Sequence, residues 1–334
     1  MSKRGVIIGK FYPPHKGHEY LIQQGLSQAD QVTVIICDKA GQSIPGELRA
    51  QRLREIFPQA TVVVVEDLLG DTDSQGWAEF TIKTLGYRPD VVFTSEKYGD
   101  NYAKFLGARH VLVDLDRKTV PICATSIRKD PLSCWEHMSP CVRAHFAKRV
   151  CIVGAESTGK TTMAKALGDH YQTTWVPEYG RMYSEGRWKS LETDAWRTDE
   201  FVHIARQQNA MEDAFARSCR KILVCDTDSF ATSLWHERYV GHIAKKVDDV
   251  SAGRKYNLYF LADVDVPFVQ DGLRDGEKIR KSMHVRFREE LERRNKPFLV
   301  LSGSHEQRLK KAIQECDKLI AMESRAGTRI QERC

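Results

Sequence analysis

Short runs of apolar residues rich in β-branched side chains recur along the first part of the chain, at 5–9, 31–37, 61–66, 90–94 and 110–114. Between these runs apolar residues follow a helical spacing, as Leu53, Ile56 and Phe57 do. Wholly apolar runs that alternate with amphipathic segments are typical of parallel strands covered by helices on both faces. The pattern therefore predicts a doubly wound parallel sheet.

The alternation pauses over 128–149, which holds two prolines and no clean strand pattern. A second series of apolar runs follows at 149–154, 173–178, 221–228, 256–263 and 297–303. A chain of 334 residues is also longer than one core usually supports. We therefore expect two doubly wound parallel-sheet domains of the α/β class, residues 1–147 and 148–334, with the boundary near Ala147.

Composition narrows the class of protein. Apolar residues make up 41% of the chain and charged residues 29%, as in soluble globular proteins. The net charge of +6 comes without a block of Lys or Arg, which favours small anionic ligands over nucleic acid. No apolar run approaches about 18 residues, so we expect neither a membrane span nor a signal peptide. Nine cysteines without CxxC spacing indicate free thiols in a cytoplasmic protein.

The segment GAESTGKT, Gly154–Thr161, matches the pattern G-x-x-x-x-G-K-[ST] between an apolar run and a helical pattern. The glycines let backbone N–H groups turn toward a phosphate, and the start of the helix adds positive potential. Lys160 can reach the β- and γ-phosphates of ATP, and Thr161 can ligate Mg²⁺. We expect ATP to contact Gly154, Glu156, Ser157, Thr158, Gly159, Lys160, Thr161 and Thr162.

Two acidic residues end the apolar run KILVCDTD, 221–228. Open α/β sheets bind ligands at the carboxyl ends of their strands, so we expect Asp226 to orient Mg²⁺ and to accept the proton of an attacking hydroxyl. Asp228 either shares that role or caps the helix that begins near Ser229.

The segment QDGLRDGEKIR, 270–280, is rich in Gly, Asp and Arg. In small P-loop kinases a mobile lid supplies arginines that neutralise the transferring phosphoryl group. Arg274 and Arg280 are therefore candidates for contact with ATP. The alternative is a solvated surface loop.

Two histidines stand three apart in GKFYPPHKGH, 9–18, directly after the first apolar run. A zinc site would need further ligands, and the neighbouring sequence offers no Cys. After the two prolines a helix is expected to begin near the glycine between the histidines. This places His15 and His18 at a helix N-terminus and at the carboxyl end of a strand, where polyphosphates bind. Imidazoles there donate to phosphate oxygens, and Lys10 and Lys16 add positive charge.

This segment resembles the G-x-F-x-P-x-H-x-G-H signature of the nucleotidyltransferase superfamily, and CATSIR, 123–128, is similar to its second signature, S-[GS]-T-x-x-R. Thr125 and Arg128 fall in place. Cys123 stands where the signature has serine, and a thiol is a weaker hydrogen-bond donor than a hydroxyl.

A nucleotidyltransferase followed by a P-loop kinase resembles the bifunctional nicotinamide-mononucleotide adenylyltransferase/ribosylnicotinamide kinase family (NadR type). The segments 93–108, 176–181 and 226–232 are also similar to that family. The resemblance implies a Rossmann-like first domain and a P-loop kinase second domain. Some members carry an N-terminal helix-turn-helix repressor domain, but the first predicted strand begins at Gly5, so we expect none here.

For the first domain, the resemblance implies attack of the phosphate of nicotinamide mononucleotide on the α-phosphorus of ATP, which yields NAD⁺ and pyrophosphate. His15 and His18 would hold the ATP phosphates, Thr125 and Arg128 would grip the departing ones, and Mg²⁺ would bridge them. Gly9, Lys10 and Phe11 are further ATP contacts. Trp77 either stacks on the nicotinamide ring or belongs to the core. Asp38 either meets polar ligand groups or caps a turn.

For the second domain, the resemblance implies transfer of the γ-phosphoryl group of ATP to the 5′-hydroxyl of ribosylnicotinamide. Lys160 and Thr161 would handle ATP and Mg²⁺, with Asp226 as the base. Glu178 and Arg181 would lie at the substrate mouth, and the alternative for them is a surface ion pair.

Two other functions stay open. The same folds could act on phosphopantetheine or flavin mononucleotide, or transfer cytidylyl groups. The chain could also be a nucleotide-sensing regulator with weak turnover, an alternative that Cys123 favours. The sequence leaves a homo-oligomer open, and Cys334 has no inferred role.

Overall fold

The apolar runs of the first half form a parallel sheet in the computed structural model, with the strand order β3-β2-β1-β4-β5. Its strands are β1 Arg4–Gly9, β2 Gln31–Asp38, β3 Thr61–Glu66, β4 Val91–Thr94 and β5 Arg109–Leu112. β2 and β4 flank β1 on opposite sides, so the chain reverses its direction of winding at β1. The carboxyl end of β1 is therefore the switch point at which such sheets bind ligands.

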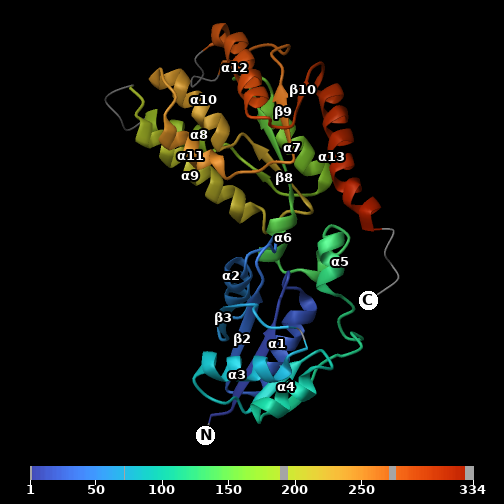
Figure 1. Cartoon of the computed structure of the whole chain (residues 1–334). Coiled ribbons are helices and arrows are strands. Elements are labelled where there is room, and N and C mark those ends of the chain that lie inside the picture. Colours follow the sequence, from blue (N-terminus) through green and yellow to red (C-terminus); the bar gives the residue numbers. More distant parts are fainter. Residues whose placement is uncertain (1, 71, 189–194, 271–275, 328–334) are drawn as a thin grey trace. The chain divides into compact units, whose positions relative to one another are not determined.

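Side chains of β1 alternate between two separate cores, which explains why the whole run is apolar. Ile7 packs with residues of α1 and α2 on one face, whereas Val6 and Ile8 pack with residues of α3 and α4 on the other. Helices thus cover both faces of the sheet (Figure 1). The helices of this part are α1 Lys16–Gln28, α2 Gly46–Ile56, α3 Ser74–Leu85, α4 Gly99–Leu106, α5 Ala124–Lys129, the 3₁₀ helix η1 Trp135–His137, and α6 Pro140–Phe146.

The second series of apolar runs forms another parallel sheet, with the strand order β10-β9-β6-β8-β7. Its strands are β6 Lys148–Val153, β7 Trp175–Val176, β8 Ile222–Asp226, β9 Leu258–Ala262 and β10 Phe298–Leu301. β6 is the central strand, and the segment Gly154–Thr161, which we call the P-loop, follows it. All ten predicted strands are present, and the predicted class of two doubly wound α/β sheets is confirmed.

Helices of the second half also pack on both sides of their sheet (Figure 1). Val150 and Ile152 of β6 share one core with α7 and α13. The helices are α7 Lys160–Tyr171, α8 Tyr179–Trp188, α9 Thr198–Phe215, α10 Ser229–Val240, α11 Lys245–Ala252, the 3₁₀ helix η2 Glu277–Ile279, α12 Arg280–Arg293 and α13 His305–Gly327.

The structure describes residues 2–70, 72–188, 195–270 and 276–327. Backbone contacts divide the chain into two compact units, one made mainly of the residues up to Val142 and the other spanning Arg143–Glu323. The division falls inside α6, and the predicted boundary near Ala147 follows the end of that helix. Within the described ranges, no helix combines the length and the apolar character needed to cross a bilayer.

Candidate active sites

The turn after β1 presents two stacked imidazoles. His15 is the N-cap of α1, and its ring Nδ1 accepts hydrogen bonds from the backbone N–H of Gly17 at 3.1 Å and of His18 at 3.3 Å. A neutral imidazole carries its proton on the nitrogen that does not accept, so the proton of His15 lies on Nε2. The His18 ring stacks on the His15 ring, with the centroids 3.7 Å apart. His15 thereby combines a helix cap with a fixed N–H donor.

Both imidazoles are neutral in the folded protein at physiological pH. Burial lowers the pKa of His15 to about 3 and the pKa of His18 well below its ordinary value, and the charge of Arg117 lowers the pKa of both rings. His18 Nδ1 is buried without a hydrogen-bond partner among the residues that the structure describes. Neutral rings donate N–H groups without a full charge, so a bound polyphosphate needs cations from neighbouring elements.

The second signature meets the first through Arg128. Its Nη1 donates to the carbonyl oxygen of Tyr12 at 2.5 Å, its Nη2 donates to Thr125 Oγ1 at 3.1 Å, and its guanidinium lies 4.8 Å from the centre of the Tyr12 ring. α5 is therefore held against the histidine turn, although the two segments are far apart in sequence. Cys123 occupies the N-cap position of α5 without a side-chain capping bond, and its Sγ lies 3.2 Å from Ser126 Oγ.

The two lysines of the histidine segment have different surroundings. Lys10 Nζ is 3.8 Å from Asp67 Oδ2, and the Lys10 side chain is partly exposed beside the turn. Lys16 Nζ donates to Glu19 Oε2 at 2.7 Å and to Ser139 Oγ at 2.8 Å. The charge of Lys16 is thus matched by a buried carboxylate, which leaves less of it to a phosphate than the sequence suggested.

Gly9 and Phe11 lie in the turn between β1 and the histidine pair, where the Phe11 ring packs against both Gly9 and His18. The Phe11 side chain is buried in the core shared with α1 and α2, and its ring lies 4.8 Å from the His18 ring. Its backbone has φ of 46°, a left-handed value that is uncommon outside glycine. A Cβ on Gly9 would stand 3.4 Å from the Phe11 ring. Because the side chain of Phe11 is buried, Phe11 can contact ATP through its backbone alone.

The Asp38 carboxylate pairs with Arg49, and a contact of Asp38 with polar ligand groups stays a prediction. Arg49 is fully buried and donates to Asp38 Oδ1, to the carbonyl oxygen of Lys10 and to Gln42 Oε1. A buried guanidinium requires such a carboxylate. A Cβ on Gly46 would lie 2.6 Å from Asp38, so the ion pair also requires a glycine there. Asp38 supports the end of β2 and the histidine turn.

Trp77 stands in the first turns of α3 and is partly buried. Its Nε1 donates to the carbonyl oxygen of Gly70 at 3.2 Å, and its ring packs against the core formed with α4. These contacts fit the core interpretation. A stacking role of Trp77 on nicotinamide stays a prediction.

The P-loop joins β6 to α7 through three residues with positive φ. Gly154 has φ of 143°, Ser157 has φ of 55° and Gly159 has φ of 82°. A Cβ on Gly154 would approach the carbonyl oxygen of Ala262 to 2.9 Å. Lys160 Nζ and Thr158 Oγ1 both donate to the carbonyl oxygen of Ala155 at 2.8 Å. The ammonium group of Lys160 is thus folded over the loop whose N–H groups are expected to bind phosphate.

Two carboxylates lie beside the start of α7, a buried one on Asp226 and a partly buried one on Glu178. Thr161 Oγ1 donates to Asp226 Oδ2 at 2.5 Å, and Asp226 Oδ1 is buried without a partner in the described part of the chain. Burial raises the pKa of Asp226, although the charge of Lys160 opposes this shift. Burial also raises the pKa of Glu178 to about 7, where Lys160 opposes the shift and Asp226 adds to it. The two carboxylates therefore share one ammonium group.

Among the described residues, no three His, Cys, Asp or Glu side chains gather closely enough to hold a metal ion by themselves. Mg²⁺ usually takes one or two protein oxygens together with phosphate oxygens and water. The Thr161 hydroxyl and the unpartnered oxygen of Asp226 fit that requirement.

Asp228 is a helix cap, as one of the two interpretations predicted. Its Oδ1 accepts from the backbone N–H of Ala231 at 2.9 Å, and its Oδ2 accepts from the Tyr259 hydroxyl at 2.7 Å. Thr227 has φ of 67°, a strained value for a β-branched residue. This turn directs Asp226 toward α7 and Asp228 toward α10, so two acidic residues separated by one position serve different purposes.

Two of the three arginines expected near the substrate and the lid, Arg181 and Arg280, have contacts in the structure. Arg181 Nε lies 3.3 Å from Glu185 Oε1 one turn along α8, and its charge lowers the pKa of Glu178. Arg280 is buried at the start of α12, where Nη2 donates to the carbonyl oxygens of Val266 at 2.8 Å and Ser157 at 3.2 Å. Arg280 thus packs against the P-loop and does not belong to a solvated surface loop, and its contact with ATP stays a prediction. Arg274 lies outside the described residues.

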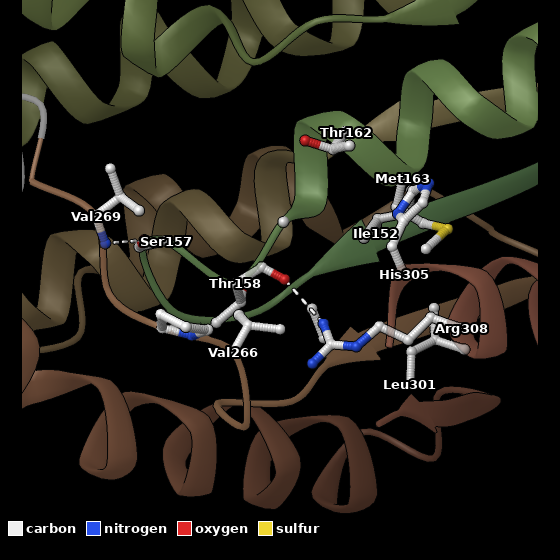
Figure 2. A pocket seen from close by; sticks show the side chains of 13 residues that line it. Ile152, Ser157, Thr158, Thr162, Met163, Val266, Val269, Leu301, His305 and Arg308 are labelled. Atoms are coloured by element: carbon white, nitrogen blue, oxygen red, sulfur yellow. Dashed lines mark hydrogen bonds between the residues drawn. The ribbon is translucent and has the colours of Figure 1, made fainter. Parts of the chain in front are cut away.

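A cavity of about 350 Å³ opens beside the P-loop (Figure 2). Its apolar wall includes Met163, Val266 and Leu301, and His305 and Arg308 also line it. Arg308 Nη1 donates to the carbonyl oxygen of Thr158 at 2.9 Å. The cavity is also lined by four residues that were predicted to contact ATP: Ser157, Thr158, Gly159 and Thr162. Local patterns did not indicate Val266, Leu301, His305 or Arg308, because these residues come from segments far from the P-loop in sequence.

Sequence reasoning also missed residues at the first site. Tyr12 stands inside the signature but was given no role, and Arg49 and Arg117 stand in segments without a recognised motif. At the second site, Glu156 of the P-loop is near enough to Glu178 to raise the pKa of the Glu178 carboxyl group.

Known proteins resemble this chain over most of its length. The trifunctional NAD biosynthesis/regulator protein NadR of Escherichia coli (strain K12) is 30% identical over 322 residues, which cover 88% of this chain and 78% of the relative. NadR of Salmonella typhimurium (strain LT2) is 30% identical over 292 residues, or 81% of this chain and 71% of the relative. A family model described as an AAA domain matches residues 149–308.

Solved structures share the fold. A crystal structure of a NadR protein in complex with NR has a TM-score of 0.76 at 21% identity and covers 96% of this chain and 97% of that chain. A NadR structure in complex with NAD and AMP-PNP has a TM-score of 0.74 at 21% identity over the same shares of both chains, 96% and 97%.

The fold and the two sites define a nucleotide-binding α/β protein with two phosphate-directed strand ends, one carrying a histidine pair and one a P-loop. Its sequence agreement with the curated relatives extends over both units. The chain belongs to the NadR family of NAD biosynthesis/regulator proteins.

The protonation of the histidine pair can be tested directly. In the ligand-free protein we expect both rings to stay neutral from about pH 8 down to about pH 5, because burial opposes the charged form. The unfolded chain takes up these protons below about pH 6.5, so the free energy of unfolding should fall as the pH falls through that range. Long-range ¹H–¹⁵N NMR, assigned with His15→Gln and His18→Gln, should find the proton of His15 on Nε2. A midpoint near pH 6.5 for either ring would contradict this geometry.

Proposed function

We propose that this chain makes NAD⁺ in two steps, one in each unit. The unit Arg143–Glu323 phosphorylates ribosylnicotinamide with ATP, and the unit that ends at Val142 joins the resulting nicotinamide mononucleotide to the AMP part of a second ATP. The observation that carries the proposal is the presence of two differently built phosphate sites, at the ends of β1 and β6, on one chain of a NAD biosynthesis family. The product of one site is then the substrate of the other.

In the adenylylation step, an oxygen of the 5′-phosphate of nicotinamide mononucleotide attacks the α-phosphorus of ATP, and the bond from that phosphorus to the bridging oxygen of pyrophosphate breaks. The attacking phosphate is already a nucleophile, so the protein contributes alignment and charge stabilisation. We assign His15 and His18 as N–H donors to the ATP phosphates, with His18 nearest the reacting centre. Thr125 and Arg128 hold the departing phosphates, and Lys10 adds charge beside them.

In the kinase step, the 5′-hydroxyl of ribosylnicotinamide attacks the γ-phosphorus of ATP and must lose its proton. Thr161 and Asp226 would hold Mg²⁺, which when bound offsets the negative charge of the phosphates. Asp226 already accepts a hydrogen bond from Thr161. We therefore assign Glu178, whose pKa of about 7 suits a base, as the group that accepts the proton of the 5′-hydroxyl. This assignment divides between two carboxylates the tasks first expected of Asp226 alone.

Contacts around the P-loop support ATP as the phosphoryl donor. The cavity of about 350 Å³ beside the loop offers an apolar wall for a nucleobase, and Lys160 and Arg280 offer charge toward the phosphates (Figure 2). Arg181 remains a candidate at the substrate mouth through its effect on Glu178.

Aromatic side chains next to Glu178 support a cationic ring as the acceptor substrate. Tyr179, Tyr183 and His203 have ring centroids between 5.7 and 6.5 Å apart, and Trp196 lies 6.2 Å from Tyr183. The faces of Tyr and Trp rings attract cations, and the nicotinamide ring of the riboside carries a positive charge. We therefore place the nicotinamide at α8 and α9.

We further propose a cytoplasmic enzyme that acts without nucleic acid. All eight cysteines in the described residues are free thiols, which suits a reducing compartment. Whether the chain forms a homo-oligomer does not enter the mechanism, because each proposed site is built within one unit. A nucleotide-sensing regulator with weak turnover is the second candidate function. Cys123 favours it, because this N-cap residue of α5 in the second signature makes no side-chain capping bond.

The two activities should be separable by single substitutions. We expect His18→Ala to lower the adenylylation rate about 10²- to 10³-fold, the usual cost of one donor to developing charge, without changing the kinase rate. Lys160→Ala should do the reverse. Pyrophosphate release with nicotinamide mononucleotide and phosphorylation of ribosylnicotinamide, each with ATP and Mg²⁺, measure the two rates. Tight binding without pyrophosphate release in the unsubstituted chain would favour the regulator, and loss of both activities in either folded variant would contradict the two-site arrangement.

The role of Glu178 predicts a pH effect on the kinase reaction alone. With saturating substrates, kcat should rise with pH through about 7, as the carboxyl group loses its proton, and then level off. Glu178→Gln should lower kcat about 10²- to 10⁴-fold and remove this rise, whereas Glu178→Asp should keep a shifted rise. The adenylylation rate of each variant is the internal control. If the Glu178→Gln enzyme kept the same rise of kcat with pH, Glu178 would not be the base and Asp226 would take that role.

A further inference from the structure

The loop between β5 and α5 is built around the carboxylate of Asp114. Its Oδ1 accepts from the backbone N–H of Thr119 at 3.0 Å and its Oδ2 from that of Val120 at 3.1 Å, while Arg117 N donates to the Asp114 carbonyl oxygen at 2.9 Å. Asp114 and Arg117 both have positive φ, 48° and 52°. Non-glycine residues hold such values at a cost, and these residues often lie at ligand sites. The loop is therefore preformed, and it presents Arg117 at a fixed place.

Arg117 lies beside the histidine pair. Its charge acts on both His15 and His18, and Ile122, near the end of the same loop, lies 3.6 Å from where a Cβ on Gly17 would stand. The loop therefore packs against the first turn of α1. This is the carboxyl edge of the sheet, where we place the ATP phosphates.

The ion pair of Arg117 is loose. Its Nη2 lies 3.8 Å from Glu96 Oε1, beyond hydrogen-bond length, and the two side chains are 40% and 58% exposed. By contrast, Arg128 is bound to Tyr12 and Thr125, and Lys16 is bound to Glu19 and Ser139. A guanidinium offers five N–H donors in a planar fork that fits phosphate. Glu96 leaves most of this capacity to a ligand.

We propose that Arg117 contacts the substrate in the first unit and that its guanidinium binds phosphate oxygens of the polyphosphate held by His15 and His18. The inference rests on the proposed adenylylation function. The neutral imidazoles donate hydrogen bonds without charge, and Arg117 supplies a positive charge near both rings. Glu96 holds Arg117 in the free protein and gives way to the phosphate, so Glu96 competes with the ligand.

This competition gives the two members of the pair opposite effects. Arg117→Ala should weaken pyrophosphate binding about 10- to 100-fold and lower kcat/KM for NAD⁺ formation at least as much, since hydrogen bonds between charged groups contribute this range. Arg117→Lys should recover part of the loss. Glu96→Gln should bind pyrophosphate as well as the unsubstituted chain does, or better. If the pair were merely structural, Arg117→Ala and Glu96→Gln would lose binding alike.

Calorimetry with pyrophosphate on the full chain measures binding, with Lys160→Ala in every sample so that the P-loop does not contribute. Lys118→Ala is the matched control, because Lys118 is the next residue of the same loop, is 82% exposed and pairs with Asp116 at 3.2 Å. The control should bind pyrophosphate within about twofold of the reference chain. Equal losses in Arg117→Ala and Glu96→Gln, or Arg117→Ala within twofold of the reference, would overturn the proposal. Failure of the proposed function is distinct: it would show as no NAD⁺ formation by the unsubstituted chain, and the binding experiment would still decide the role of Arg117.

Discussion

A polyphosphate carries several negative charges, and the donors that hold it must be fixed before it arrives. Parallel strands provide the place, because their carboxyl ends meet the N-termini of the following helices, where backbone N–H groups are unsatisfied. In this chain that constraint applies at β1 and again at β6. Cores on both faces of the first sheet keep the strand end in position, and the second sheet is packed between helices as well.

The two strand ends meet the requirement with different chemistry. After β1, His15 caps α1 with a neutral ring. Arg128 of α5 donates to the backbone of the turn at Tyr12, and Arg49, paired with Asp38, donates to it at Lys10. After β6, the loop itself supplies the N–H groups, and Lys160 lies over it near the carboxylates of Asp226 and Glu178. Neutral donors with nearby arginines suit cleavage after the α-phosphate without an enzyme base. A carboxylate with a raised pKa, as on Glu178, suits transfer of the γ-phosphoryl group to a hydroxyl that must lose a proton.

Local patterns in the sequence were sufficient for the fold and for the places of both sites. Strands and helices follow from apolar periodicity, and each signature lies at a strand end, so His15, Lys160 and Asp226 could be found without a structure. Contacts between distant segments could not be predicted in the same way. Thr161 and Asp226 are 65 residues apart, and Lys16 and Ser139 are 123 residues apart. No spacing rule indicates that Lys16 is already paired or that Arg280 is buried against the P-loop.

The claim that two separate clefts each hold a triphosphate is tested most directly by counting bound nucleotide. Equilibrium dialysis of the full chain against a non-hydrolysable ATP analogue with Mg²⁺, at saturating analogue, gives the number of molecules bound per chain. The account predicts two equivalents. A single equivalent at saturation would contradict it, because one of the two strand ends would then not be a nucleotide site.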